Sequence, residues 1–400
     1  MARPTLEFSC AFGQNPFAAL STLTWTDITA DVRIDPLVSG TPISITRGRQ
    51  SELGRVEAGS ISLTLDNSSR NYDPEYTSSP YYPNVRPMTR CRLRARWPAG
   101  GTWFTLFTGY VSAWTPQYPG GQVAVVRVAA SDAFNALARA TVSYLSTEYI
   151  NHAIGTILTL IGWPAADTFL ENAQSQVPTG PYLNQNPLQL IQSLTEAENG
   201  LFYVQGDGVL HFQDRHWRIR NATSWGTFGN GVGELPYIDA SLSYDETLIY
   251  NDVRVQRIGG ALQEAIDTAS QASYGPRLLP KSGILLGSDL EALGLAQWLL
   301  LRYSTPTLRM PQIALNGDLA PTTLWPQLLG RDISDKITAI VRPVGGGTIT
   351  KTARIEAMQH TIGLDAWRTT WQLSMAGEDQ YWKLDDSALS VLGTTTRLAY

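Results

Sequence analysis

The chain has 400 residues, of which 43% are hydrophobic and 16% are charged, and its formal net charge is −5. This length allows two or three domains with cores of their own, and the composition excludes a disordered or fibrous protein. The acidic balance disfavours a protein whose main task is to grip nucleic acid. The longest apolar run, residues 154–163, is too short and too interrupted to span a bilayer. We expect no secretory signal, because no apolar stretch follows Arg3.

Arginine dominates the basic residues. Lysine occurs at only four positions, so 26 of the 30 basic residues are arginine, and the chain also has twelve tryptophans. Arginine and tryptophan are enriched at protein interfaces, so this composition favours a chain with much of its surface covered by partners. The alternative explanation for the excess of arginine over lysine is the codon bias of a GC-rich genome.

Residues 1–140 predict short β-strands. Ile61, Leu63 and Leu65 alternate with polar residues, which is typical of a half-buried antiparallel strand. Segments 105–114 and 122–130 continue the alternation, with a Gly/Pro turn between them. Strands of this kind, separated by turns, predict a closed or nearly closed β-barrel.

The segment 90–97 alternates more strongly, with four arginines on one face and an apolar face opposite. One interpretation is a solvated strand face paired with acidic neighbours. The other is that the arginines contact carboxylates of an adjacent subunit, or passing nucleic acid. We therefore take as interface candidates Arg90, Arg92, Arg94 and Arg96.

A long polar loop, residues 66–87, separates two of these strands. Its many side-chain oxygens suggest a metal site, but a calcium loop turns about a central glycine, which is missing here. Arg70 in the middle would repel a dication, so a structural loop is favoured. Long loops inside compact domains are usually functional or disordered, and this one combines rigid prolines with tyrosines. We therefore predict that a partner protein contacts Tyr72, Tyr76, Tyr81 and Tyr82.

Residues 141–236 predict an α+β part. Isoleucines at helical spacing from Ile150 to Ile161 indicate a helix that ends at Gly162. Asn186 before a proline predicts the start of a second helix, which ends at Asn199. Two apolar runs around Asp207 and Gly208 indicate a hairpin.

Residues 237–375 predict a second β-barrel domain, interrupted by a helix over about 288–303 whose capping box is Ser288 and Glu291. Residues 376–400 show no clear periodicity. We interpret them as a C-terminal arm that packs against another surface, such as that of a neighbouring subunit. Its apolar interface candidates are Trp382, Leu384 and Leu389.

Motifs for catalysis and for cofactors are missing. The sequence contains no phosphate-binding loop, no H-E-x-x-H or C-x-x-C, and no G-x-S-x-G. Glu196 and Glu198 would diverge on a helix, so they do not form an acid/base pair. Cys10 and Cys91 are too few for a disulfide framework and are expected to be reduced. We therefore expect no catalytic residue, no metal and no cofactor.

Several segments, in order along the chain, resemble minor tail proteins of long-tailed (siphovirus-type) phages, of the tail-tip or baseplate-hub family. They are residues 43–95, 106–114, 199–215 (NGLFYVQGDGVLHFQDR), 250–260 (YNDVRVQRIGG), 272–280 (ASYGPRLLP) and 391–400 (VLGTTTRLAY). The resemblance implies a mainly β chain with an α+β middle part and two β-barrel hub domains. In such relatives, three chains form a pseudo-sixfold ring around an axial channel.

The resemblance also implies a function. The chain is expected to be a non-enzymatic hub in the virion tail tip, assembled in the host cytoplasm as a homotrimer. Its expected partners are the distal tail or tail tube protein, the tape-measure protein and tip or fibre proteins, with DNA passing without specific binding. No lysozyme-like, peptidase or carbohydrate-binding domain is expected in this chain. The alternatives are a receptor- or glycan-binding module, suggested by the aromatic residues, and a wall hydrolase, supported only by unplaced carboxylates.

Overall fold

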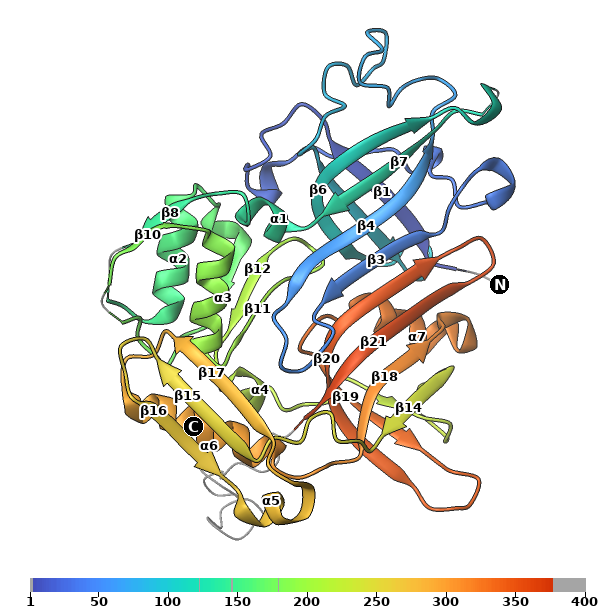
Figure 1. The fold of residues 1–400 in the computed structure, drawn as a ribbon. Helices are drawn as coiled ribbons and strands as arrows, with labels where there is room; N and C mark the ends of the chain where they lie inside the picture. The colour runs from blue at the N-terminus through green and yellow to red at the C-terminus, as the bar shows by residue number, and fades with distance from the viewer. Residues whose placement is uncertain (1–2, 122, 145–146, 179, 377–400) are drawn as a thin grey trace.

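A computed structural model describes residues 3–121, 123–144, 147–178 and 180–376 of the chain (Figure 1). The candidates Trp382, Leu384 and Leu389 lie outside the described residues. Strands dominate the architecture, so the mainly β character predicted from the sequence is confirmed. Within the described residues, no helix is both long enough and apolar enough to cross a membrane.

A sheet of thirteen strands forms the largest layer, and it draws on both ends of the chain. The N-terminal strands are β1 Thr5–Ala11, β2 Thr26–Asp27, β3 Ile43–Gly48, β4 Glu57–Asp66, β5 Arg90–Arg96, β6 Trp103–Gln117 and β7 Val125–Ser131. The C-terminal strands are β13 Thr227–Phe228, β14 Asp239–Ser243, β18 Arg309–Leu315, β19 Lys336–Val341, β20 Ile349–Ile362 and β21 Trp367–Met375. On β4, Ile61, Leu63 and Leu65 are buried and Ser60 and Ser62 are exposed, as the alternation predicted, whereas Thr64 of the predicted polar face is buried.

The long strand β20 joins the two groups of strands. Its first half pairs with β19, and its second half pairs with β3, where His360 lies opposite Ile45. The strands of the large sheet therefore follow one path, in the order β14-β18-β21-β20-β3-β4-β7-β6-β5-β1-β2. Among the described strands, no pairing joins the two ends of this path. The two closed barrels expected from the sequence are not confirmed. Instead, the β-rich parts share a single core, which includes Phe107, Trp325 and Trp371.

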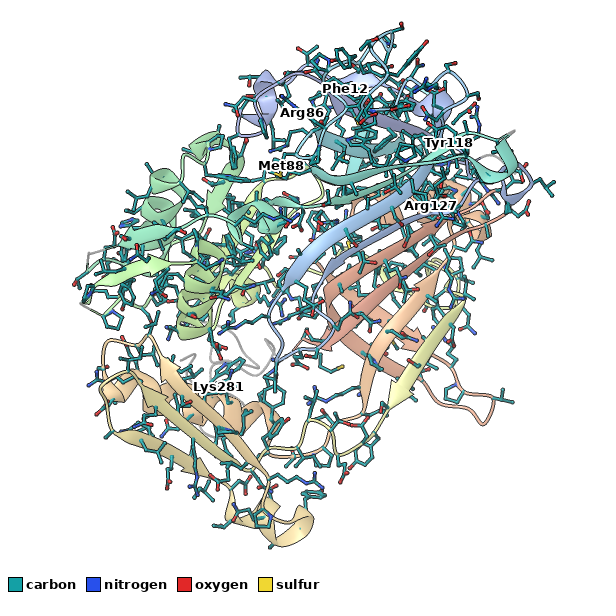
Figure 2. The ribbon with its side chains drawn as sticks, turned by 45° about the horizontal axis from the view of Figure 1, so that its top comes forward. Phe12, Arg86, Met88, Tyr118, Arg127 and Lys281 are labelled. Atoms are coloured by element: carbon teal, nitrogen blue, oxygen red, sulfur yellow. The ribbon has the colours of Figure 1, made fainter. Side chains whose placement is uncertain are left out.

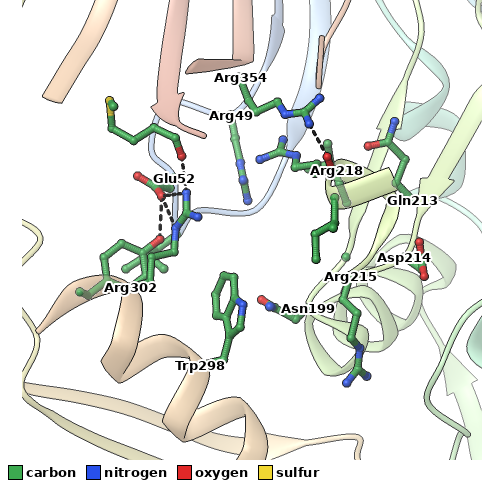
Figure 3. A pocket seen from close by; sticks show the side chains of 16 residues that line it. Arg49, Glu52, Asn199, Gln213, Asp214, Arg215, Arg218, Trp298, Arg302 and Arg354 are labelled. Carbon is green, nitrogen blue, oxygen red and sulfur yellow. Dashed lines mark hydrogen bonds and ion pairs between the residues drawn. The ribbon is translucent and has the colours of Figure 1, made fainter. Parts of the chain in front are cut away.

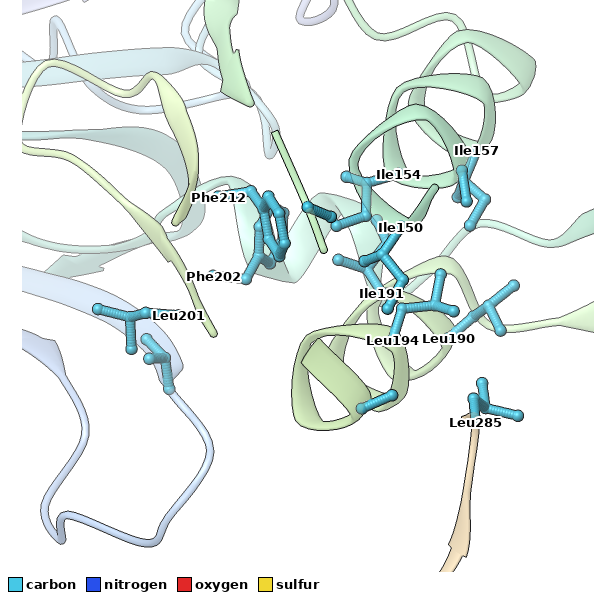
Figure 4. Packing of buried hydrophobic residues seen from close by; sticks show 14 of the residues in the cluster. Ile150, Ile154, Ile157, Leu190, Ile191, Leu194, Leu201, Phe202, Phe212 and Leu285 are labelled. Carbon is cyan, nitrogen blue, oxygen red and sulfur yellow. The ribbon is translucent and has the colours of Figure 1, made fainter. Parts of the chain in front are cut away.

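The middle of the chain is an α+β layer. Its elements are α1 Ala133–Leu137, β8 Val142–Tyr144, α2 Ile150–Leu160, β9 Thr168–Leu170, β10 Tyr182–Gln185, α3 Pro187–Glu198, β11 Leu201–Val204, β12 Leu210–Gln213 and α4 Trp217–Arg220. Both predicted helices are confirmed. Asn186 caps α3 by accepting a hydrogen bond from the Gln189 amide (3.1 Å), and Asn199 ends it in the left-handed conformation. Figure 4 shows Ile154 of α2 packed between α3 and Phe212 of β12.

A small three-stranded sheet forms a third layer with a long helix. Its strands are β15 Asp252–Arg257, β16 Leu262–Ile266 and β17 Leu278–Ile284, and its helices are α5 Thr268–Tyr274 and α6 Asp289–Tyr303. Helix α6 confirms the predicted helix and its cap, since Ser288 accepts a hydrogen bond from the Glu291 amide. Val255 and Leu299 belong to the same buried cluster as α2 and α3. The segment 237–375 therefore divides: this layer packs with the middle part, while β14, β18–β21 and α7 Pro321–Gly330 join the large sheet.

Candidate functional site

The loop after β4 is a series of tight turns. Every third amide from Arg70 to Tyr82 donates a hydrogen bond to the carbonyl three residues earlier. The buried Asn67 stabilises the loop, because its side-chain oxygen accepts a hydrogen bond from the Tyr72 amide (3.0 Å). Among the described residues, no group of three or more His, Cys, Asp or Glu side chains is placed to hold a metal ion. The loop is therefore an ordered structural element.

Two of the four loop tyrosines point inward. Tyr72 is fully buried; its ring stacks on Trp114 at a centroid distance of 6.0 Å, and its hydroxyl donates to Asp31 (2.5 Å). Tyr81 is half-buried and stacks on Phe12 at 4.3 Å. The prediction that Tyr72 belongs to a surface for a partner is wrong for this chain. The loop turns its ring into the core, where it buries more apolar area than it would at the surface.

The other two tyrosines face solvent. Tyr82 is 45% exposed, and Tyr76 is half-buried beneath the guanidinium of Arg70 (4.7 Å). Tyr118 in the turn between β6 and β7 adds a further exposed ring, with its hydroxyl 3.4 Å from Asp73 of the loop. Figure 2 shows Tyr118 at the same end of the molecule as Phe12 and Arg86. Tyr118 lies outside the tyrosine-rich segment, so the sequence pattern did not indicate it.

The arginine face of β5 is occupied largely by its own chain. The pairing of β1 with β5 places Glu7 opposite Arg94, whose guanidinium donates to both carboxylate oxygens (2.8 and 2.6 Å). Arg92 also reaches Glu7 (3.3 Å) and lies over the ring of Trp25 at 4.4 Å. Partial burial of Arg92, with the positive charge of Arg94 beside it, lowers the pKa of the Arg92 guanidinium.

Aromatic rings also contact the arginines of this face. Arg94, already paired with Glu7, and Arg96 both lie over Trp103, at 4.6 and 4.5 Å. Arg90 is buried and donates to the hydroxyl of Tyr110 (2.6 Å). Arg90 is therefore not a surface residue of this chain, whereas Arg92, Arg94 and Arg96 remain half-buried and can still be reached by a partner.

The three layers meet at a network of ion pairs that the sequence did not indicate. Glu52, in the loop between β3 and β4, accepts hydrogen bonds from Arg302 (2.8 Å) and Tyr303 (3.0 Å) of α6 and from Arg309 (2.9 Å) of β18. All three of these partners lie about 250 residues from Glu52 in the sequence. No local pattern could have indicated this contact; the excess of arginine was the only signal.

A second buried carboxylate, Glu356 of β20, lies nearby. It accepts from Arg49 (2.7 Å), from Arg218 (2.6 Å) and from the hydroxyl of Ser374 (2.5 Å). Burial by itself would raise the pKa of Glu356, but the two guanidiniums outweigh this effect and hold its pKa well below the ordinary range. Glu356 is therefore ionised and binds α4 to the large sheet.

Beside Glu52 lies a cavity of about 110 Å³ that is partly open to solvent (Figure 3). Figure 3 shows Trp298 and Asn199 at its centre, between Arg302 on one side and Arg218 on the other. Its charged lining residues are Arg49, Glu52, Asp214, Arg215, Arg218, Arg302 and Arg354. The lining guanidiniums make ion pairs within the chain: Arg49 and Arg218 with Glu356, Arg215 with Glu198, and Arg302 with Glu52.

The chain matches no protein-family model and no curated protein sequence. Its fold is similar to that of the 43 kDa tail protein of prophage MuSo2 from Shewanella oneidensis, with a TM-score of 0.54 and 12% identity over 94% of this chain and 98% of that one. It is also similar to a tail protein from Neisseria meningitidis MC58, with a TM-score of 0.58 and 11% identity over 93% of this chain and 97% of that one. The resemblance to phage tail proteins is thus confirmed at the level of the fold.

Proposed function

We propose that this chain is a structural component of a phage tail. The observation that carries the proposal is the similarity in fold to two tail proteins, which extends over at least 93% of this chain and nearly the whole of each relative. The resemblance of the sequence to minor tail proteins supports the same role independently.

Within the tail, the chain acts as a tail-tip or baseplate hub. Three copies form a ring that joins the tail tube protein to the tip or fibre proteins, and its channel lets the tape-measure protein and then DNA pass. The role is geometric and not enzymatic. Support comes from the hub-like sequence segments and from the half-buried or exposed groups Tyr76, Tyr82 and Arg92, which a second copy can contact.

DNA passes through this ring without specific binding. The chain carries a net charge of −5, and like charges repel within a Debye length of about 10 Å. Glu7, Glu52 and Glu356 also neutralise part of the positive charge inside the chain. A strongly positive channel in the assembled ring would contradict this part of the proposal.

The test is a mass measurement of the purified chain by light scattering, followed by negative-stain imaging. A trimer of 43.9 kDa chains has a mass of about 132 kDa and should appear as rings. A particle that keeps the mass of one chain at every salt and protein concentration would overturn the hub role. Zymography on peptidoglycan tests the non-enzymatic part, and a cleared zone would overturn it.

The glycan-binding alternative receives less support from the structure. Its argument was the number of tryptophans, yet Trp325, Trp367 and Trp371 are among the largest fully buried side chains. Of the tryptophans in the described residues, Trp225 alone is a strongly exposed ring, and Arg331 lies over it at 4.3 Å. Binding of the isolated chain to a glycan array would favour this alternative.

A further inference from the structure

The two cysteines of the chain lie opposite each other on neighbouring strands. The antiparallel pairing of β1 with β5 sets Cys10 against Cys91, and no register shift interrupts this ladder. Residues that face each other in this way project from the same side of the sheet. Both side chains are fully buried in the core of the large sheet, and both are free thiols. The two thiols therefore share one enclosed, apolar environment.

The backbone of β1 shows which kind of pair the cysteines form. Phe8 lies two residues before Cys10. Its carbonyl accepts a hydrogen bond from the Ile28 amide (2.9 Å), and its amide donates to the Thr29 hydroxyl (2.8 Å). Both of these partners follow directly after β2, on the side of β1 that faces away from β5. Because backbone groups repeat their direction at every second residue of a strand, those of Cys10 also point away from β5.

The backbone of β5 leads to the same conclusion. Thr89, two residues before Cys91, accepts a hydrogen bond from the Val111 amide at 2.9 Å, and Cys91 itself pairs with Gly109 of β6. The polar backbone groups of Cys91 therefore point towards β6 and away from β1. Cys10 and Cys91 are thus a non-hydrogen-bonded pair, in which the Cα atoms lie about 4.5 Å apart and the side chains approach most closely. This separation is within the range of about 4.4–6.8 Å between Cα atoms that a disulfide requires.

We propose that Cys10 and Cys91 are a redox site, at which a small disulfide such as oxidised glutathione converts the two thiols into a disulfide. One cysteine thiolate attacks the glutathione disulfide and displaces one glutathione. The second cysteine thiolate attacks the cysteine sulfur of the mixed disulfide and displaces the other glutathione. The cysteines lose two electrons and two protons, and the oxidant takes them up as two glutathione thiols. The proposal concerns a single chain and does not rest on the tail role.

Burial controls when this reaction occurs. Desolvation raises the pKa of Cys91 to about 12 and the pKa of Cys10 well above its ordinary value, so in the closed fold both are protonated and unreactive. The reaction therefore requires β1 to separate locally from β5. Among the described strands, the outer neighbour of β1 is β2, which is two residues long. The disulfide, once formed, closes residues 10–91 into a loop and holds the N-terminal strand on β5.

Alkylation and mass spectrometry of the full-length chain test the proposal. The folded chain is incubated with oxidised glutathione in sub-denaturing urea, which favours the opening of β1, and is then unfolded and treated with iodoacetamide. We expect a chain without alkyl groups whose mass has fallen by two hydrogen atoms, whereas the chain treated with dithiothreitol should carry two alkyl groups. The matched control Cys91→Ala leaves Cys10 without its partner, so Cys10 should be alkylated or carry one glutathione. Refolding from urea in the same glutathione buffer is the second route, because it exposes both cysteines to the oxidant.

The disulfide should also raise the midpoint of thermal unfolding by about 5 °C, because it restricts the unfolded chain over a long loop. Free thiols after both routes, glutathione retained on both cysteines, or a disulfide between chains would each overturn the proposal. An oxidised chain with an unchanged or lower midpoint would also overturn it, since the folded strands would then not accommodate the bond.

Discussion

Arg302 on helix α6 and Glu52 in the β3–β4 loop form an ion pair. This ion pair links the third layer, which contains α6, to the large sheet. The Glu52 side chain is 8% exposed and also accepts from Tyr303 and Arg309. Removing one partner of such a buried network leaves the other charges desolvated and unpaired.

Glu52→Gln should therefore lower the free energy of unfolding by about 3 kcal/mol. Urea unfolding followed by fluorescence measures this change. The control is Glu57→Gln, the same substitution at an exposed position on β4, which should change stability by less than about 0.5 kcal/mol. Equal effects of the two substitutions would mean that the network adds no stability.

Gly48 is required where β3 meets β20. Its φ is +104°, and a Cβ atom at this position would lie 2.2 Å from the carbonyl oxygen of Glu356. Gly48→Ala should destabilise the chain by more than about 3 kcal/mol, since both the backbone conformation and the close approach are lost. Thermal unfolding measures the loss. Gly100→Ala, also at positive φ but with open space around it, is the control for the conformational part alone.

Asp132 should give the stability a measurable dependence on pH. Desolvation raises the pKa of this buried carboxyl from 3.8 to about 7, although the amides of Gly59 and Phe134 donate to it. Because the folded pKa lies above the unfolded one, the folded state binds the proton more tightly. The stabilising contribution is therefore complete below pH 3.8 and is lost as the pH rises to about 7.

The free energy of unfolding, measured at intervals from pH 4 to pH 7, should fall less steeply for Asp132→Asn than for the wild type. Asp207→Asn provides a comparison at an exposed carboxylate that also accepts a backbone amide hydrogen bond, here from Val209. An unchanged slope in Asp132→Asn would show that the carboxyl titrates at the same pH in the folded and unfolded chain.

Two loop tyrosines should respond differently to substitution. Tyr72→Phe removes the hydrogen bond to Asp31 inside the core and should cost about 1 kcal/mol of stability without affecting assembly. Tyr82→Ala removes an exposed ring, so it should leave stability within about 0.5 kcal/mol and reduce the fraction of trimer. Light scattering and urea unfolding on both variants separate the effects. Full trimer formation by Tyr82→Ala would exclude this ring from the interface.

Local patterns in the sequence predicted the helices α2, α3 and α6 and the strand alternation of β4 and β5. Those features depend on neighbours within a few residues: the spacing of isoleucines in α2, the cap at Asn186, and the cap at Ser288. The same patterns, together with the resemblance to tail proteins, were enough to indicate the fold of a tail component, and the solved structures agree.

Long-range packing decided the rest. The pairing of β3 with β20 joins residues about 310 positions apart and merges the expected barrels into one sheet. The Glu52–Arg302 contact and the arginine-lined cavity depend on that arrangement, as does the burial of Tyr72 beside the exposed Tyr82. Tyr72 and Tyr82 are the same residue type in the same loop, so the local sequence does not distinguish them. The difference is that the Tyr72 ring packs in the core, against Asp31 and Trp114 from other parts of the chain.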